Sequence, residues 1–201
     1  MNTINPLLPG YQFAEYLLVL NPHEELQHKI FTVKQTLKEK YKTAVPANKS
    51  HITLVQFYTW QMMEDKIKQR LQMIAMGTTP YKIELKDYGS FPSHTIYITV
   101  NTKNVIQRLV KELRTARRLM KSPDKNPQFI MEPHIPVARK LNAVQFKEAW
   151  TEYAHRHFTG SFIADSMLLL KKKAGDSKYQ IVQRFEFMNL PVNVKQGELF
   201  S

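Results

Sequence analysis

The feature that most constrains the fold of this chain is a long internal repeat of strand and helix patterns. Alternating apolar residues mark half-buried strands, and apolar residues three or four positions apart mark one face of a helix. The first copy predicts a strand over 13–20, a helix over 23–41, a strand over 50–58 and a helix over 65–76. Paired strands over 81–85 and 95–100 follow, joined by the turn residues Asp87, Gly89, Pro92 and Ser93. The second copy predicts a helix over 104–120, a strand within 129–139, a helix over 146–158 and paired strands over 162–171 and 179–187. The same order of elements therefore occurs twice.

The spacing between equivalent residues supports the repeat. Tyr16 and Tyr97 lie 81 positions apart, Tyr97 and Tyr179 lie 82 apart, and His51 and His134 lie 83 apart. We therefore expect an α+β fold with two antiparallel sheets, outer helices and pseudo-twofold symmetry, in which each half contributes one histidine. We expect one domain made of approximate repeats 11–100 and 95–187, followed by a C-terminal tail over 188–201.

The composition limits the kinds of site and of binding partner that we expect. The chain has 201 residues, no cysteine and a net charge of +12. The lack of cysteine excludes disulfides, thiolate nucleophiles and cysteine-ligated metals. A large positive charge attracts anions such as RNA and nucleotides. No signal peptide or membrane span is predicted, so we expect a monomeric cytoplasmic protein without membrane association.

The candidate site begins with His51-Ile52-Thr53-Leu54. Residues two apart on a strand project from the same face, so His51 and Thr53 are expected to lie together. Imidazole moves protons near neutral pH, and a hydroxyl can donate to a phosphoryl oxygen. The equivalent strand carries His134-Ile135-Pro136-Val137, so two imidazoles could act as general acid and general base on one phosphorus.

A metal site is not predicted. No Asp or Glu shares the strand face of either histidine, and two histidines alone form an incomplete set of ligands. We therefore expect chemistry without a metal or any other cofactor.

These motifs resemble the two-histidine (2H) phosphoesterases, and within them the 2′-5′ RNA ligase-like proteins and cyclic phosphodiesterases. The resemblance covers about residues 11–187. Ser50-His51-Ile52-Thr53-Leu54 is similar to the first family motif, and the segment from Glu132 to Lys140 is similar to the second. The resemblance implies a bilobed fold with a central cleft, and cleavage or formation of 2′,5′-linkages and hydrolysis of cyclic phosphates in RNA or nucleotides. It also implies that His51 and His134 are catalytic and that Thr53 binds phosphate.

Pro136 departs from the family pattern, which usually places Thr or Ser there. Proline has neither a hydroxyl nor an amide hydrogen to donate. Arg139 is retained from the motif and is a candidate phosphate ligand, although strict alternation from His134 would place Lys140, not Arg139, on the same face. Three interpretations stay open: an enzyme, a non-catalytic RNA- or nucleotide-binding module that kept the cleft, and a basic scaffold for an acidic protein.

Overall fold

The computed structural model describes residues 12–45, 49–92 and 94–191. The helices and strands follow the predicted order: β1 (Phe13–Leu20), α1 (Glu24–Tyr41), β2 (Ile52–Trp60), α2 (Glu64–Gly77), β3 (Tyr81–Phe91), β4 (Thr95–Val100), α3 (Lys103–Leu113), β5 (Gln128–Phe129), β6 (His134–Arg139), α4 (Ala143–Tyr153), β7 (Thr159–Ala164), β8 (Ser166–Lys173) and β9 (Gln180–Glu186).

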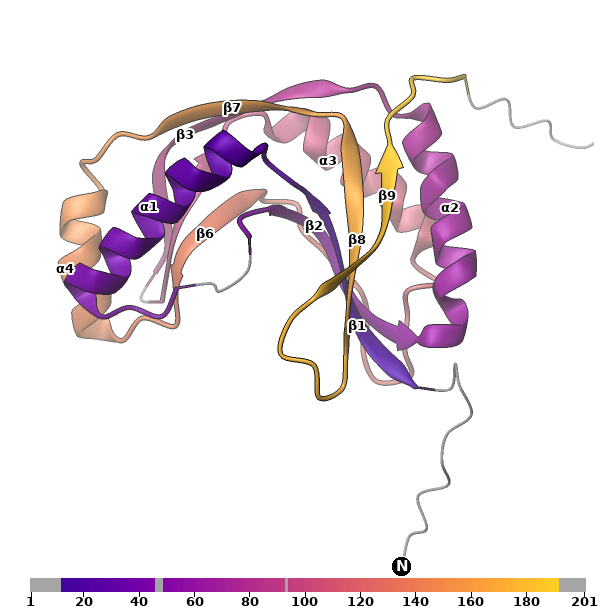
Figure 1. The fold of residues 1–201 in the computed structure, drawn as a ribbon, viewed down its shortest axis with the longest axis horizontal. Helices are drawn as coiled ribbons and strands as arrows, with labels where there is room; N and C mark the ends of the chain where they lie inside the picture. Colours follow the sequence, from indigo (N-terminus) through magenta and orange to yellow (C-terminus); the bar gives the residue numbers. More distant parts are fainter. Residues whose placement is uncertain (1–11, 46–48, 93, 192–201) are drawn as a thin grey trace, which may run out of the picture.

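The strands form two antiparallel sheets, one with the order β5-β2-β1-β8-β9 and the other with the order β6-β4-β3-β7 (Figure 1). The pseudo-twofold symmetry is visible in these orders, because β2-β1-β8-β9 corresponds to β6-β4-β3-β7. Each sheet contains strands from both halves of the chain. The two strands that carry the motifs, β2 and β6, occupy equivalent positions in different sheets, and some of their Cα atoms lie within 8 Å of each other.

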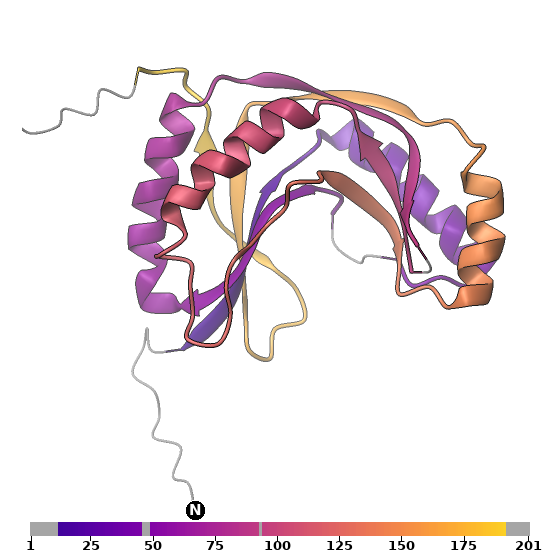
Figure 2. The same cartoon turned by 180° about the vertical axis from the view of Figure 1, so that it is seen from behind.

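α1 and α3 each connect two strands of one sheet but pack against strands of the other sheet. α1 connects β1 and β2 of one sheet, but it packs against β6 and β7 of the other and against α4. α3 connects β4 and β6 and packs against β2 and α2, as the view from behind shows (Figure 2). A single cluster of buried apolar side chains joins both sheets and all four helices. The crossing therefore places residues of α1 beside the second motif strand.

Two predicted elements were partly wrong. The predicted strand over 162–171 is two strands in different sheets, because the chain leaves one sheet after Ala164 and enters the other at Ser166. The predicted helix over 104–120 ends at Leu113 and tightens into a 3₁₀ turn over Arg114–Ala116. The N–H groups of Arg117, Leu119 and Met120 each donate to the carbonyl three residues back, and Met120 is fully buried.

The turn predicted from Asp87 to Ser93 was also partly wrong, because β3 continues to Phe91. Asp87 instead lies in an irregularity of the β3–β4 pairing, with a φ of 55°. Its carboxylate accepts from the Phe158 N–H at 3.3 Å, which stabilises the kinked backbone within the strand.

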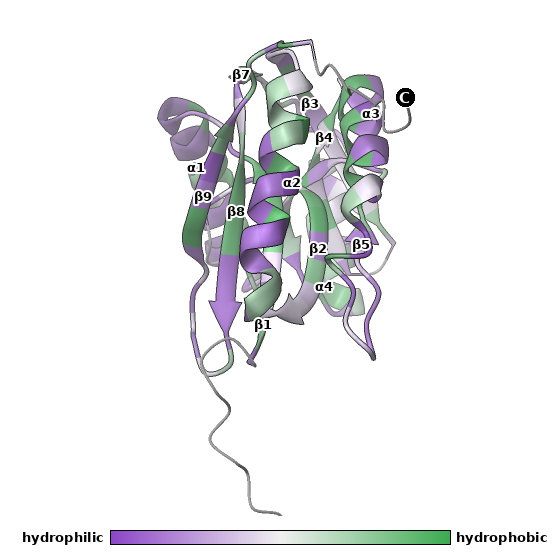
Figure 3. Ribbon diagram, turned by 90° about the vertical axis from the view of Figure 1, so that its right-hand side faces the viewer, coloured by the Kyte–Doolittle hydropathy of each residue, from purple (hydrophilic) through white to green (hydrophobic). Residues whose placement is uncertain are grey.

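The last features of the fold are the end of β8 and the C-terminal tail. Figure 3 shows that β8 turns hydrophilic at its carboxyl end, where Lys171–Lys173 lie. Of the predicted tail, residues 188–191 follow the end of α2, with the Leu190 N–H bonded to the Met76 carbonyl at 2.8 Å, and the rest lies outside the described residues. No helix in the described part of the chain is long and apolar enough to cross a membrane.

Candidate active site

The first motif lies at the start of β2. Gln27 of α1 holds this segment by its side-chain amide, which donates to the Ser50 carbonyl and accepts from the Ser50 N–H at 2.8 Å. His51 follows directly, and its Nδ1 lies 2.9 Å from the Lys49 carbonyl oxygen. His51 and Thr53 line the same cavity, in agreement with the spacing of two residues on a strand.

The second motif repeats this arrangement at the start of β6. His134 Nδ1 lies 2.8 Å from the Glu132 carbonyl oxygen, two residues earlier in the chain. A carbonyl can only accept, so in both histidines Nδ1 carries the hydrogen and Nε2 of the neutral ring is left as an acceptor. The two halves of the chain therefore prepare two imidazoles in the same tautomer, each with Nε2 ready to take a proton.

A small cavity of about 130 Å³ lies beside the first motif. Its walls come from α1, β1, β2, β6 and the residues just before β2 and β9: Leu17, Lys34, Lys49, Ser50, His51, Thr53, Gln56, Ile135, Pro136, Arg139 and Tyr179. The cavity thus brings together His51, Thr53 and Arg139 of the predicted site. His134 is not among the lining residues, although the next two residues of its strand are.

Arg139 corrects the expectation from strict alternation. The β4–β6 pairing shifts register between Ile96 and Tyr97, which pair with Ala138 and Pro136, so Val137 is an extra residue on β6. Such a bulge reverses the facing of everything after it. Arg139 therefore joins Pro136 on the cavity wall, and Lys140, which has a φ of 55°, does not line it.

The cavity is strongly cationic. Three basic side chains line it, Lys34, Lys49 and Arg139, and none of its described lining residues is acidic. Burial is the main cause that lowers the pKa of His51 to about 4, with the charges of Lys34 and Arg139 acting in the same direction. Burial, followed by the charge of Arg139, lowers the pKa of Lys34 to about 8. The site therefore disfavours further positive charge and favours an anion.

Aromatic rings surround His134. The Phe91 ring meets its imidazole edge-on, with centroids 4.9 Å apart, and the Tyr97 ring lies 5.1 Å away. Gly89 makes room for Tyr97, because a Cβ at this position would lie 2.5 Å from the ring. Burial lowers the pKa of His134 as well.

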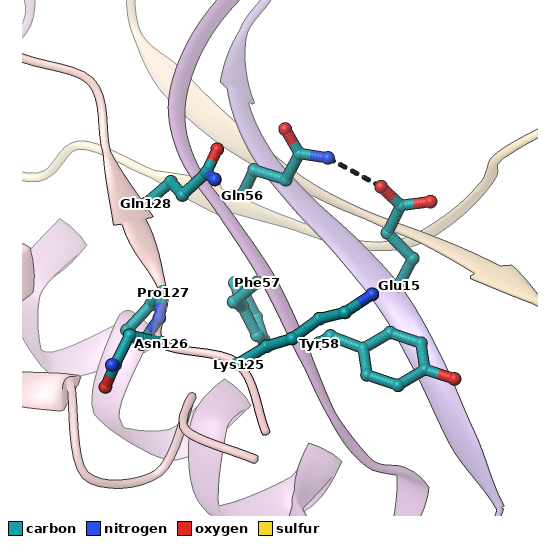
Figure 4. Close-up of a pocket in the computed structure, with 8 residues that line it drawn as sticks. All are labelled: Glu15, Gln56, Phe57, Tyr58, Lys125, Asn126, Pro127 and Gln128. Carbon is teal, nitrogen blue, oxygen red and sulfur yellow. Dashed lines mark hydrogen bonds between the residues drawn. The ribbon is translucent and has the colours of Figure 1, made fainter. Parts of the chain in front are cut away.

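A larger cavity of about 650 Å³ adjoins the first one along β2 (Figure 4). Gln56 lines both cavities, and its amide donates to the Glu15 carboxylate at 2.6 Å. The other walls carry aromatic, amide and basic side chains and one proline, namely Phe57, Tyr58, Lys125, Asn126, Pro127 and Gln128. This mixture of flat rings and hydrogen-bonding amides suits the base or sugar of a nucleotide.

Sequence reasoning missed Lys34 and Gln56, whereas Tyr179 was considered as a ring that could stack on a base. Lys34 was detectable, because it follows Ile30 by four positions and precedes Leu37 by three, on the apolar stripe of α1. Gln56 gave no such signal, since its place in the cavity depends on the pairing of β1 with β2.

The described residues hold no group of three or more side chains able to bind a metal ion.

Comparisons with known proteins agree with this arrangement. The family model of the 2′-5′ RNA ligase superfamily matches residues 22–176. A protein of Geobacillus thermodenitrificans (strain NG80-2) that carries a phosphoesterase name is 26% identical over 148 residues, which cover 71% of this chain and 79% of that protein.

Solved structures show the same fold at low identity. E. coli LigT in its apo form has a TM-score of 0.64 at 16% identity, covering 88% of this chain and 98% of LigT. LigT complexed with 3′-AMP has a TM-score of 0.57 at 15% identity, with the same coverage. Since the family model spans more than half of the sequence, the chain belongs to the 2′-5′ RNA ligase superfamily, within the two-histidine phosphoesterases.

Proposed function

We propose that this protein is a metal-independent phosphoesterase acting on 2′,3′-cyclic phosphates or 2′,5′-phosphodiesters of RNA or nucleotides. His51 and His134 are its general acid and general base. The observation that carries the proposal is the matched pair of imidazoles. In each of them Nδ1 contacts the backbone carbonyl two residues earlier, and the two strands approach each other beside a cationic cavity.

The chemistry follows from the free Nε2 atoms. In hydrolysis, one Nε2 takes a proton from water while the water oxygen attacks phosphorus. The other imidazole, protonated, gives its proton to the ribose oxygen as the P–O bond breaks. The roles reverse in ligation, where a ribose hydroxyl attacks. Burial keeps both rings neutral in the empty protein, and a bound phosphate raises the pKa of the ring that must carry the proton.

Thr53 and Arg139 are proposed to bind the non-bridging oxygens. Both line the small cavity. The Thr53 hydroxyl can donate one hydrogen bond, and the planar guanidinium of Arg139 can donate two to one phosphate. The negative charge that builds on these oxygens in the transition state is then stabilised by donors already in place.

The substrate class is supported by the larger cavity. It shares Gln56 with the small one, and we propose that the nucleoside of a phosphate held beside His51 lies next to Tyr58, Asn126 and Gln128. The fold relative LigT has been solved with 3′-AMP, a nucleotide with a phosphate on the ribose. A nucleotide or the end of an RNA therefore fits better than a small phosphate ester.

Pro136 favours a second candidate, a non-catalytic RNA- or nucleotide-binding module, because this strand lacks the second donor hydroxyl. The two candidates separate in one experiment. Turnover of a 2′,3′-cyclic nucleotide is followed over pH with EDTA present, for the wild type, His51→Ala, His134→Ala and the exposed-residue control His155→Ala.

The enzyme predicts turnover that resists EDTA, is lost in both motif variants and persists in the control. A binding module predicts no product in any of the four proteins and RNA binding that survives both substitutions. Turnover that EDTA abolishes would reject the metal-free mechanism.

A further inference from the structure

The end of α3 and the segment that follows it concentrate the positive charge of the chain. Residues 108–125 include seven basic side chains and two acidic ones, so this stretch accounts for five of the twelve net positive charges. Four of the cations fall within eight positions, namely Arg114, Arg117, Arg118 and Lys121. All four are exposed, while Ala116 and Met120 of the same segment are buried. The buried residues fix the segment against the core and leave the cations in solvent.

α2 adds a fifth cation to this surface. The exposed guanidinium of Arg70 donates to the Thr115 hydroxyl at 2.8 Å, and α2 contacts the segment that follows α3, as the view from behind shows (Figure 2). We call the five cations together the basic ridge: Arg70, Arg114, Arg117, Arg118 and Lys121. None of them makes an ion pair with a carboxylate in the part of the chain that the structure describes. By contrast, Lys68 of α2 pairs with Asp65.

The stability of α3 does not account for the basic ridge. Cations in the last turn of a helix interact favourably with its dipole, but Lys111 already lies there, and the effect falls off beyond that turn. Like charges three or four positions apart repel each other, and Arg114 has Arg117 and Arg118 at these spacings. The 3₁₀ turn at Arg114 aligns residues three apart more closely than an α-helix does. The arrangement is unfavourable in the free protein and becomes favourable when phosphate groups lie between the cations.

The basic ridge reaches the edge of the sheet that carries the first motif. The Arg114 guanidinium lies 5.8 Å from the ring centroid of Phe129 in the edge strand β5. The preceding residue, Gln128, pairs with Gln56 of β2 and lines the larger cavity. Arg114 is therefore two residues of β5 away from the proposed nucleoside site.

A short loop continues the positive charge from the basic ridge into that cavity. The loop is held by Ser122, which is buried: its N–H donates to the Lys125 carbonyl at 3.1 Å, and its hydroxyl accepts from the Lys125 N–H at 3.1 Å. The loop thus begins at Lys121 of the ridge and ends at Lys125, which lines the cavity. The Lys125 side chain extends over the Tyr58 ring, with Nζ 4.9 Å from the ring centroid (Figure 4).

We propose that the basic ridge binds the phosphate backbone of an RNA strand whose 3′ end lies in the candidate active site. The terminal nucleoside occupies the larger cavity, and the preceding nucleotides pass Lys125, round the sheet edge at β5 and follow the ridge. Four of the five ridge cations are arginines, whose planar fork donates two hydrogen bonds to one phosphate. The inference rests on the proposed function for the position of the 3′ end. It goes beyond that function because it makes an RNA strand, and not a mononucleotide, the preferred ligand.

The test uses the ridge variant Arg114→Gln/Arg117→Gln/Arg118→Gln. Its binding to a single-stranded RNA of about ten nucleotides with a 3′-phosphate is compared with its binding to 3′-AMP, over a range of salt concentrations. At about 0.1 M salt, the variant should bind the RNA on the order of 10- to 100-fold more weakly than the wild type. The slope of log affinity against log salt should decrease by about 2, since each contact with a single strand contributes about 0.7. Affinity for 3′-AMP should stay within about twofold, which also shows that the variant is folded.

The matched control removes three positive charges elsewhere, in Lys38→Gln/Lys42→Gln/Lys147→Gln. These lysines are exposed and lie on or beside α1 and α4. The control should keep the RNA salt slope of the wild type. Replacing the three ridge arginines by lysine should also keep most of the slope, because the charges remain.

Equal RNA affinity and salt slope in the ridge variant and the wild type would overturn the proposal, as would an equal loss in the control, which would indicate net charge alone. RNA that fails to displace 3′-AMP would show that the basic ridge does not lead to the site. A polyglutamate peptide that displaces RNA as well as unlabelled RNA does would indicate an acidic protein partner instead.

The failure of this inference can be told apart from the failure of the proposed function. RNA binding that depends on the basic ridge in a wild type without turnover would reject the enzyme and leave the inference standing. Turnover of an RNA with a 2′,3′-cyclic end that is equal in the wild type and the ridge variant, at RNA concentrations below KM, would do the reverse.

Discussion

The two halves of the site agree in how they hold their histidines and differ in what surrounds them. His51 and His134 use the same Nδ1 contact with a carbonyl two residues back. His51 shares its cavity with a hydroxyl and three basic side chains, while His134 packs against Phe91 and Tyr97 and has Pro136 two positions later. Orienting an imidazole requires only local backbone, so both halves achieve it. Phosphate binding needs side chains from several elements, and here one half supplies most of them.

The largest effect should come from breaking the feature that the halves share. His51→Ala and His134→Ala should each lower kcat on a 2′,3′-cyclic nucleotide by on the order of 10²–10⁴, because each removes a proton-transfer group. The double variant should be little worse than either single one, since the pair acts as a unit. If the kcat losses of the two single variants multiply in the double variant, the two imidazoles do not serve the same step.

The second-largest effect should come from Thr53, the donor hydroxyl that the second motif lacks. Thr53→Val removes the hydroxyl at nearly constant size and should lower kcat by on the order of 10²–10³, the usual loss for one oxyanion donor. Pro136→Ala removes no donor and should change kcat by less than about threefold. Equal losses in the two variants would mean that Thr53 serves packing and not the transition state.

The protonation of the two histidines gives a third comparison. Burial lowers the pKa of both rings, for His51 from 6.5 to about 4. NMR titration should therefore show His51 becoming charged only near pH 4, and His134 below its ordinary range. A histidine with a lowered pKa binds fewer protons folded than unfolded, so stability should fall as pH drops from about 6.5 towards 4. His51→Ala should flatten this part of the stability curve in chemical denaturation, and an unchanged slope would contradict the burial of His51.

Much of the site could be predicted from local sequence, and the rest depends on pairing between distant strands. The facing of His51 and Thr53 follows from alternation along one strand. The facing of Arg139 does not, because the bulge at Val137 exists only where β6 pairs with β4. The division of residues 162–171 between two sheets likewise depends on strands far away in the chain. Lys34 lies between these cases: its place on an apolar stripe is visible in the sequence, but its place on the cavity wall beside Pro136 and Arg139 depends on the crossing of α1 onto β6.

The smallest effect should come from disturbing only the aromatic surroundings of His134. Gly89→Ala places a methyl group where the outer edge of the Tyr97 ring lies, and that ring can give way only by moving against its neighbours, Phe91 and His134. The tilt of the His134 imidazole should then change while His51 and Thr53, which lie at the start of β2 in the other sheet, stay in place. We expect kcat to fall by several-fold to about tenfold, because general acid–base catalysis is sensitive to small misplacements. Affinity for 3′-AMP should stay within about twofold. Tyr97→Phe is the control, since it keeps the ring and removes only the hydroxyl. A loss of 3′-AMP affinity in Gly89→Ala as large as the loss of kcat would show that the two halves of the site are coupled through the core and do not work as separable parts.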